Sequence, residues 1–130
     1  MRHQKVKQWE KKLKHIFDEI DTELETQYAG RFSRHPARPK AGTTSNPEMD
    51  GLFNVGASYS AGFGSKWGPG YVVDIRLATL QPISRHFKNE LRNSVQQLLK
   101  QKLPAAFPNK KLCVSKEKNY LRIHGDLSLD

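Results

Sequence analysis

The sequence predicts one α+β domain in which two amphipathic helices pack on an antiparallel four-stranded sheet, in the chain order α-β-β-α-β-β. Two segments, 4–29 and 85–103, carry apolar residues at steps of three and four, which is helical periodicity. The remaining segments come in pairs that alternate apolar and polar residues, as antiparallel strands do. The 130 residues suit a single domain. Within it we expect an N-terminal helical arm (1–30), a loop (31–51) and a ββαββ core (52–130).

The first predicted helix has an apolar stripe and an unusual order of charges. Lysines dominate its front half and acids its back half, which opposes the helix macrodipole. Two copies packed antiparallel would set each basic half against an acidic half. We therefore expect a homodimer, with an interface formed by Trp9, Leu13, Ile16, Phe17, Ile20 and Leu24. The alternative is that this stripe packs on its own domain.

Residues 31–51 are rich in proline and glycine, which break both helix and strand. Their first ten positions hold a basic cluster of Arg31, Arg34, His35, Arg38 and Lys40. Arginines on a loop can fork onto phosphates and become ordered on binding. We expect this cluster to contact nucleic acid; the alternative is a solvated linker.

The first strand pair is predicted over 52–63 and 71–80. In the first of these strands the alternation places every apolar side chain from Phe53 to Phe63 on one face. In the second strand Tyr71, Val73, Ile75 and Leu77 share a face. The opposite face is expected to be polar, with Asn54, Ser58, Ser60, Asp74 and Arg76.

The connection between these strands reads GFGSKWGPG, residues 62–70. Phosphate-cradling loops need a helix directly after their glycines, and here a strand follows. The glycines, Gly62, Gly64, Gly68 and Gly70, are therefore interpreted as turn residues that permit positive φ. Trp67 beside Lys66 suits base stacking with phosphate contact. The favoured alternative is that Trp67 folds back on the core, because tryptophan is buried on average.

The second predicted helix begins after the N-cap Ser84 and ends at Pro104. Two short strands follow, over 111–115 and 120–124, around the turn 116–119. Their alternation places leucine, valine and isoleucine on one face. Arg122 is counted among the exposed basic residues of this hairpin.

The charge of the chain is its strongest functional signal. The formal net charge is +9, and residues 81–130 carry ten Lys or Arg against four acids, a local charge of +6. Such an excess favours polyanionic partners. With Lys66, Trp67, Lys110 and Lys111 the basic loop forms the expected nucleic-acid-binding set. Solvated surface charge is the alternative.

Catalysis finds little support in the sequence. No histidine has metal-ligand spacing with Cys113 or with an acid, so we expect no metal and no cofactor. Cys113, the single cysteine, is expected to be a buried structural thiol. With one cysteine, no secretory signal and no apolar run of about 20 residues, a cytoplasmic protein without a membrane span is expected.

The sequence thus favours a non-enzymatic nucleic-acid-binding protein. An assembly module that dimerises through its first helix is the alternative. A small enzyme or binder of a phosphorylated ligand, using the same arginines, is the third interpretation.

Overall fold

A computed structural model describes residues 4–28 and 52–127. It contains α1 (Gln4–Gln27), β1 (Phe53–Ser60), β2 (Gly70–Leu77), α2 (Arg85–Ala106), β3 (Leu112–Glu117) and β4 (Tyr120–Gly125). The α+β class and the order α-β-β-α-β-β are confirmed. The predicted loop 31–51 lies outside the described residues.

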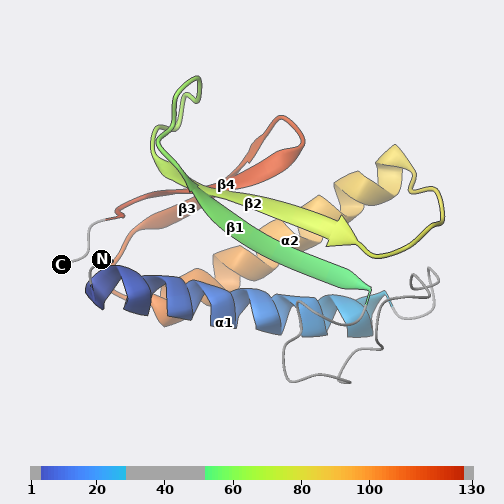
Figure 1. Cartoon of the computed structure of the whole chain (residues 1–130), viewed down its shortest axis with the longest axis horizontal. Coiled ribbons are helices and arrows are strands. Elements are labelled where there is room, and N and C mark those ends of the chain that lie inside the picture. The colour runs from blue at the N-terminus through green and yellow to red at the C-terminus, as the bar shows by residue number, and fades with distance from the viewer. Residues whose placement is uncertain (1–3, 29–51, 128–130) are drawn as a thin grey trace.

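The four strands form one antiparallel sheet in the order β1-β2-β4-β3, so β1 and β3 are its edges. Both helices cover the same face of this sheet, and the other face is open (Figure 1). The helix-facing side chains of the strands, among them Phe53, Val73, Leu121 and Ile123, are at most 1% exposed. The open face is therefore where polar side chains of all four strands gather.

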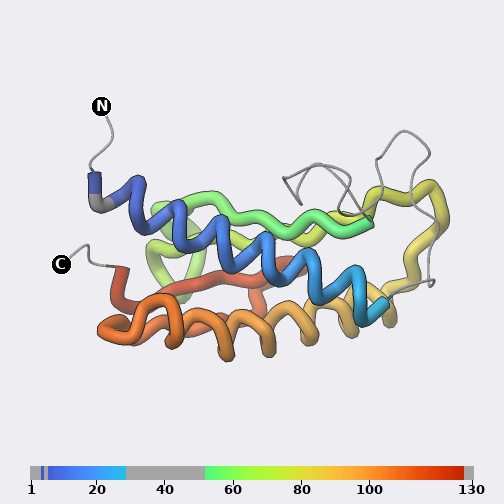
Figure 2. Tube along the Cα trace, turned by 90° about the horizontal axis from the view of Figure 1, so that it is seen from below, coloured from blue at the N-terminus to red at the C-terminus, as the bar shows by residue number. Residues whose placement is uncertain are grey.

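The two helices run antiparallel beneath the sheet (Figure 2). The Nζ atom of Lys12 lies 3.5 Å from the carbonyl of Ala106, whereas Tyr28 contacts Ser94 with 2.7 Å between their hydroxyls. The apolar stripe of α1, including all six residues of the expected dimer interface, is at most 6% exposed and packs on α2 and the sheet of the same chain. This is the arrangement of the alternative interpretation, and a second copy could reach the stripe only if the domain opened.

The acids in the back half of α1 have partners elsewhere in the chain. Lys102 of α2 pairs with Glu19 at 2.8 Å and with Glu23 at 3.1 Å. The contact with Lys102 lowers the pKa of Glu19, and the contact with Glu19 raises the pKa of Lys102. Asp21 and Glu25 accept hydrogen bonds from the backbone of β1. The acids of α1 thus find their partners in α2 and at the edge of the sheet.

Several predicted element ends are wrong, among them the end of the second strand, which lies at Leu77 rather than at residue 80. The first strand ends at Ser60 rather than at residue 63, because Gly62 adopts a φ of 91° and turns the chain. α2 continues through Pro104 to Ala106. An exposed proline within the last turn removes one hydrogen bond, and Phe107 still bonds to the carbonyl of Leu103 at 2.8 Å. The turn between β3 and β4 has two residues, Lys118 and Asn119, rather than the four predicted. Lys118 has a φ of 52°.

Candidate functional site at the β1–β2 loop

The loop between β1 and β2, residues 61–69, folds over the open face of the sheet. Gly62, Gly64 and Gly68 have φ values of 91°, 80° and 77°, as the turn interpretation predicted. At Gly62 a Cβ would lie 2.2 Å from the carbonyl carbon of Gly68, so the two ends of the loop touch. The predicted positive φ of Gly70 is wrong. Gly70 is required for another reason: a Cβ there would lie 2.3 Å from the carbonyl oxygen of Ile123 in β4.

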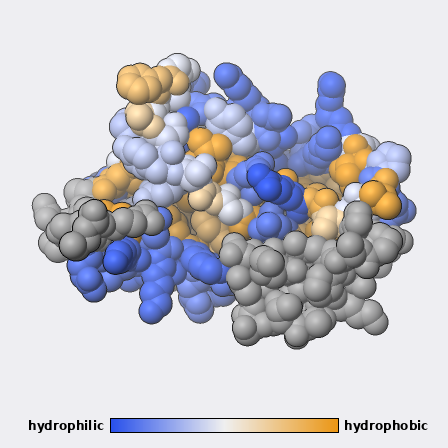
Figure 3. All heavy atoms as spheres, viewed as in Figure 1, coloured by the Kyte–Doolittle hydropathy of each residue, from blue (hydrophilic) through white to orange (hydrophobic). Residues whose placement is uncertain are grey.

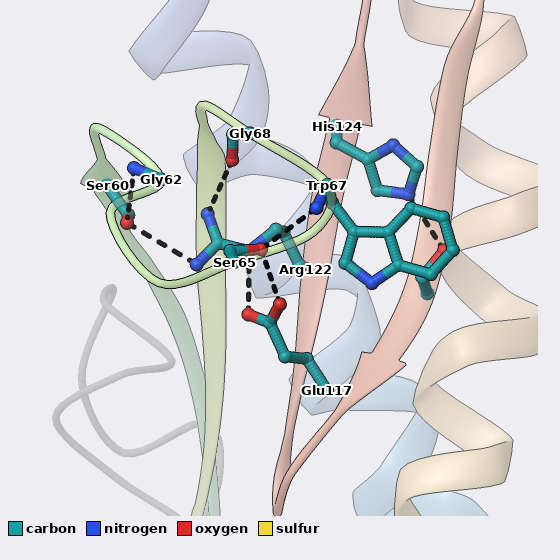
Figure 4. A network of polar contacts seen from close by, with 9 residues as sticks. Ser60, Gly62, Ser65, Trp67, Gly68, Glu117, Arg122 and His124 are labelled. Carbon is teal, nitrogen blue, oxygen red and sulfur yellow. Dashed lines mark hydrogen bonds and ion pairs between the residues drawn. The ribbon is translucent and has the colours of Figure 1, made fainter.

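A buried arginine holds this loop on the sheet (Figure 4). Arg122 projects from β4 onto the open face, yet it is only 3% exposed because the loop covers it. Its Nη1 donates to the carbonyl of Gly68 at 3.2 Å and its Nη2 to the hydroxyl of Ser60 at 3.4 Å. Its Nε donates to Glu117 of β3 at 2.8 Å. The expectation that Arg122 is an exposed basic residue is therefore wrong.

Glu117 completes the clamp from the neighbouring strand. The Ser65 hydroxyl donates to its second carboxylate oxygen at 2.5 Å and accepts from the backbone N–H of Trp67 at 3.1 Å. The Ser65 hydroxyl and then the Arg122 guanidinium lower the pKa of Glu117 to about 2. The same ion pair raises the pKa of Arg122. Both groups are charged at any ordinary pH, so the clamp is a permanent ion pair with the loop bound to both of its ends.

Trp67 lies on His124 of β4 (Figure 4). The two rings are stacked, with centroids 4.7 Å apart and planes at 18°. His124 is held by the hydroxyl of Ser115 at 2.7 Å, and burial together with the charge of Arg122 lowers its pKa. The Lys66 ammonium lies 4.8 Å from the centroid of Trp67. Trp67 does fold back, but onto the open face, and it remains 36% exposed.

The residue that protrudes is Phe63. It is 97% exposed, more than any other large apolar side chain of the described residues. Figure 3 shows an apolar tip on this loop, at the top left of the molecule. Strand alternation had placed Phe63 on the inward face, which is wrong because the strand ends three residues earlier. Tyr59, 62% exposed, sits at the root of the loop edge-on to Tyr71 at 5.8 Å.

The structure joins only part of the predicted binding set. Arg31, Arg34, His35, Arg38 and Lys40 lie outside the described residues. Lys66 and Trp67 lie over the C-terminal end of β4. Lys111 is exposed. It lies at the same end of the sheet, because its carbonyl accepts a hydrogen bond from the N–H of Asp126 at 2.9 Å. Lys110 beside it is half-buried.

The described part of the open face carries one exposed thiol and no grouping of metal ligands. Among the described residues no three His, Cys, Asp or Glu side chains are grouped to hold a metal ion. The expected burial of Cys113 is wrong: it is exposed, because Val114 takes the inward position of β3 and its neighbour must point outward. Neither described helix is long and apolar enough to cross a bilayer.

Two comparisons found known proteins that are similar to this chain. Residues 4–125 match a protein family described as "Uncharacterised protein", and the chain belongs to that family. The chain is also similar to an uncharacterised protein of Borreliella burgdorferi, with 31% identity over 121 residues that cover 93% of this chain and 94% of the relative. No solved structure matches. The family match runs from α1 to the end of β4 and so includes the clamped loop.

Proposed function

We propose that the protein binds single-stranded nucleic acid at the β1–β2 loop and the adjoining end of the sheet. The observation that carries the proposal is the nearly complete exposure of Phe63 on a loop that Arg122 and Glu117 hold in place. An exposed aromatic ring held in one place offers a flat face on which another ring can stack. A nucleobase can stack on such a ring whatever its sequence.

The surroundings of Phe63 support a polyanionic ligand. Lys66 lies on the same loop and Lys111 on the same end of the sheet. The basic cluster of residues 31–40 adds four further Lys or Arg in the sequence, within a chain of net charge +9. Cations that contact phosphates, together with aromatic rings that stack on bases, are the combination that single-strand binders use.

Single strands are favoured over duplex because of the shape of the loop. Phe63 is one protruding ring on a short loop, not a helix that could fill a major groove. In a single strand the bases are free to stack on it, whereas in a duplex they are stacked on each other. Trp67 already stacks on His124, so we assign the base contact to Phe63 and a supporting role to Trp67.

The test is fluorescence anisotropy with labelled single-stranded and duplex oligonucleotides at several salt concentrations. With about five phosphate contacts, the log–log slope against salt should be roughly −3.5 on single strands. Phe63→Ala should weaken single-strand binding about tenfold, as expected for one lost stacking contact. Lys66→Ala should flatten the slope by about 0.7.

Two matched variants control for general effects. Leu80→Ala removes another exposed apolar side chain, 75% exposed, from the β2–α2 connection, and Lys100→Ala removes an exposed lysine of α2. Both should bind as the parent does. Equal affinity for duplex together with no effect of Phe63→Ala would reduce the interaction to charge alone. No binding at physiological salt would reject the proposal.

A further inference from the structure

The edge strand β1 is covered by α1 along only half of its length. Phe53 and Val55 donate their outward N–H groups to carboxylates of α1: Phe53 to Glu25 at 2.9 Å and Val55 to Asp21 at 2.8 Å. Leu52 also donates to Glu25. Asp21 is only 2% exposed, so this capping belongs to the packed interior. The first half of the edge is thereby closed to other strands.

None of the residues that the structure describes covers the second half of the edge. In an antiparallel pair, alternate residues direct both backbone groups toward the partner strand and the others direct both away. Because Phe53 and Val55 face away from β2, Ala57 and Tyr59 do so as well in the unbroken register of β1. Among the described residues no hydrogen-bond partner is found for their outward N–H and C=O groups. An edge of this kind is a template for a further strand.

A groove accompanies the open edge. β1 rises away from α1 toward the β1–β2 loop (Figure 1), and a hollow of about 470 Å³ lies between the two elements. Its apolar lining comes from Leu13, Phe17, Val55 and Tyr71. Ala57, which faces α1 as Val55 does, contributes only a methyl group to the wall beside the edge.

The rim of the groove carries three lysines and two acids. Lys7, Lys11 and Lys14 line it on successive turns of α1, with Glu10 and Asp18 among them. Lys14 is engaged by Asp18 at 3.4 Å, whereas Lys7 and Lys11 are exposed. Acidic side chains of a ligand would therefore find complementary charge here.

We propose that the open half of β1 binds an extended segment of a partner protein as a fifth strand. Ala57 and Tyr59 would supply the backbone hydrogen bonds, an apolar side chain of the segment would enter the groove, and flanking acidic side chains would face Lys7 and Lys11. Strand addition beside a helix is an established mode of peptide recognition: backbone bonds give affinity and side-chain pockets give specificity.

An acidic partner suits this edge better than a second copy of the chain. Two β1 edges paired with each other would bring two lysine-lined rims together, in a protein that already carries a charge of +9. Like charges opposed across an interface disfavour it. The proposal does not depend on nucleic-acid binding, because neither Phe63 nor Lys66 lines the groove.

The probe is a fluorescein-labelled peptide of about nine residues that alternates glutamate with valine, a length that suits one strand. Its controls are the same peptide with lysine for glutamate and an acidic version with prolines that cannot pair. The readouts are anisotropy and amide hydrogen exchange of the full-length protein. We expect saturable binding of the acidic peptide only, and slower exchange at Ala57 and Tyr59.

Three variants separate backbone pairing from charge. Ala57→Pro removes an outward N–H but no β1–β2 bond, and should weaken binding about tenfold or more, since proline is tolerated on strand edges but cannot donate. Lys7→Glu with Lys11→Glu should weaken it similarly. Lys100→Glu makes the same charge change on an exposed part of α2 and should have no effect.

Several outcomes would overturn the proposal. If the charge variants weaken binding but Ala57→Pro does not, and no amide of β1 gains protection, the peptide binds by charge alone. If the amides of Ala57 and Tyr59 gain protection with rising protein concentration and no peptide, the occupant is a second copy. If Ala57→Pro fails to fold, the exchange data on the parent protein still decide whether β1 is the site.

Discussion

Arg122 shows how one side chain converts a glycine-rich connection into an ordered surface. Its guanidinium reaches the loop at Gly68, the strand end at Ser60 and the carboxylate of Glu117. A buried arginine must be paired and fully hydrogen-bonded to be tolerated, and here the loop itself supplies part of that pairing. The loop and the ion pair are therefore stable only together.

Replacing Arg122 should release the loop. In Arg122→Met the chain keeps a side chain of similar length but loses all three contacts, so the amides of Trp67 and Gly68 should exchange at least about tenfold faster with solvent. Arg76→Met is the matched control, because Arg76 lies on the same face, is paired with Asp74 at 2.9 Å and is 75% exposed. Exposed pairs contribute little, so that variant should leave exchange at the loop unchanged. Equal effects would contradict the clamp.

The clamp also predicts a dependence of stability on pH. The pKa of Glu117 is lowered to about 2 from an ordinary 4.5, so its contribution is fully present above pH 4.5 and is lost as the pH falls toward 2. Glu117→Gln should therefore be less stable than the parent near neutral pH, and the difference should shrink on acidification below 4.5. Chemical unfolding of both proteins across this range measures it. A constant difference would mean that the carboxylate charge is not what holds the loop.

At the scale of elements, two glycines of the β1–β2 loop differ in the space available to a side chain. Gly62 and Gly64 both have positive φ, but a Cβ at Gly62 would strike the carbonyl of Gly68, whereas one at Gly64 would meet nothing within 4 Å. Gly64→Ala should cost about 1 kcal/mol for the left-handed backbone. Gly62→Ala should cost a further 1–3 kcal/mol, roughly, because the loop must open to admit the methyl group. Urea unfolding compares the two, and equal costs would show that the loop ends do not touch.

The elements themselves could be predicted because each depends on local pattern. Periods of 3.6 and 2 decided the type of all six, and they placed Leu121 and Ile123 correctly on the helix-covered face. The ends of the elements depend on tertiary contacts, so the local pattern did not predict them. Phe63 continues the alternation of β1 in sequence, but the turn at Gly62 takes it out of the strand.

The site was less predictable than the fold. Lys66 and Trp67 stand out in the sequence, whereas Arg122 was grouped with the neighbouring lysines as one more surface charge. One signal was available: alternation puts Arg122 and His124 on the face opposite Leu121, and a two-residue turn brings Glu117 to that same face. What no local pattern could reveal is that a loop more than 50 residues earlier covers them.

At the scale of the whole molecule, α1 connects the sheet, α2 and the edge strand β1. Its apolar stripe is buried under the sheet, its acids pair with Lys102 and cap β1, and its lysines line the groove beside the open edge. The acids in the back half of α1, unfavourable near the C-terminus of an isolated helix, are stabilised here because they pair with Lys102 of α2 and accept hydrogen bonds from the outward N–H groups of β1.

This role of α1 predicts how stability responds to protein concentration. Leu24 is fully buried in the core of its own chain, so Leu24→Ala should lower the free energy of unfolding by about 2–5 kcal/mol. If the stripe served a dimer interface, stability would rise with protein concentration by mass action. We expect instead that the unfolding midpoints of parent and variant stay the same over a roughly hundredfold range of concentration. Thr22→Ala, on the exposed face of the same helix, is the control and should leave the free energy of unfolding unchanged or raise it slightly, because alanine has the higher helix propensity. If the unfolding midpoint of the parent rises with protein concentration, and that of Leu24→Ala rises less, the stripe forms a dimer interface.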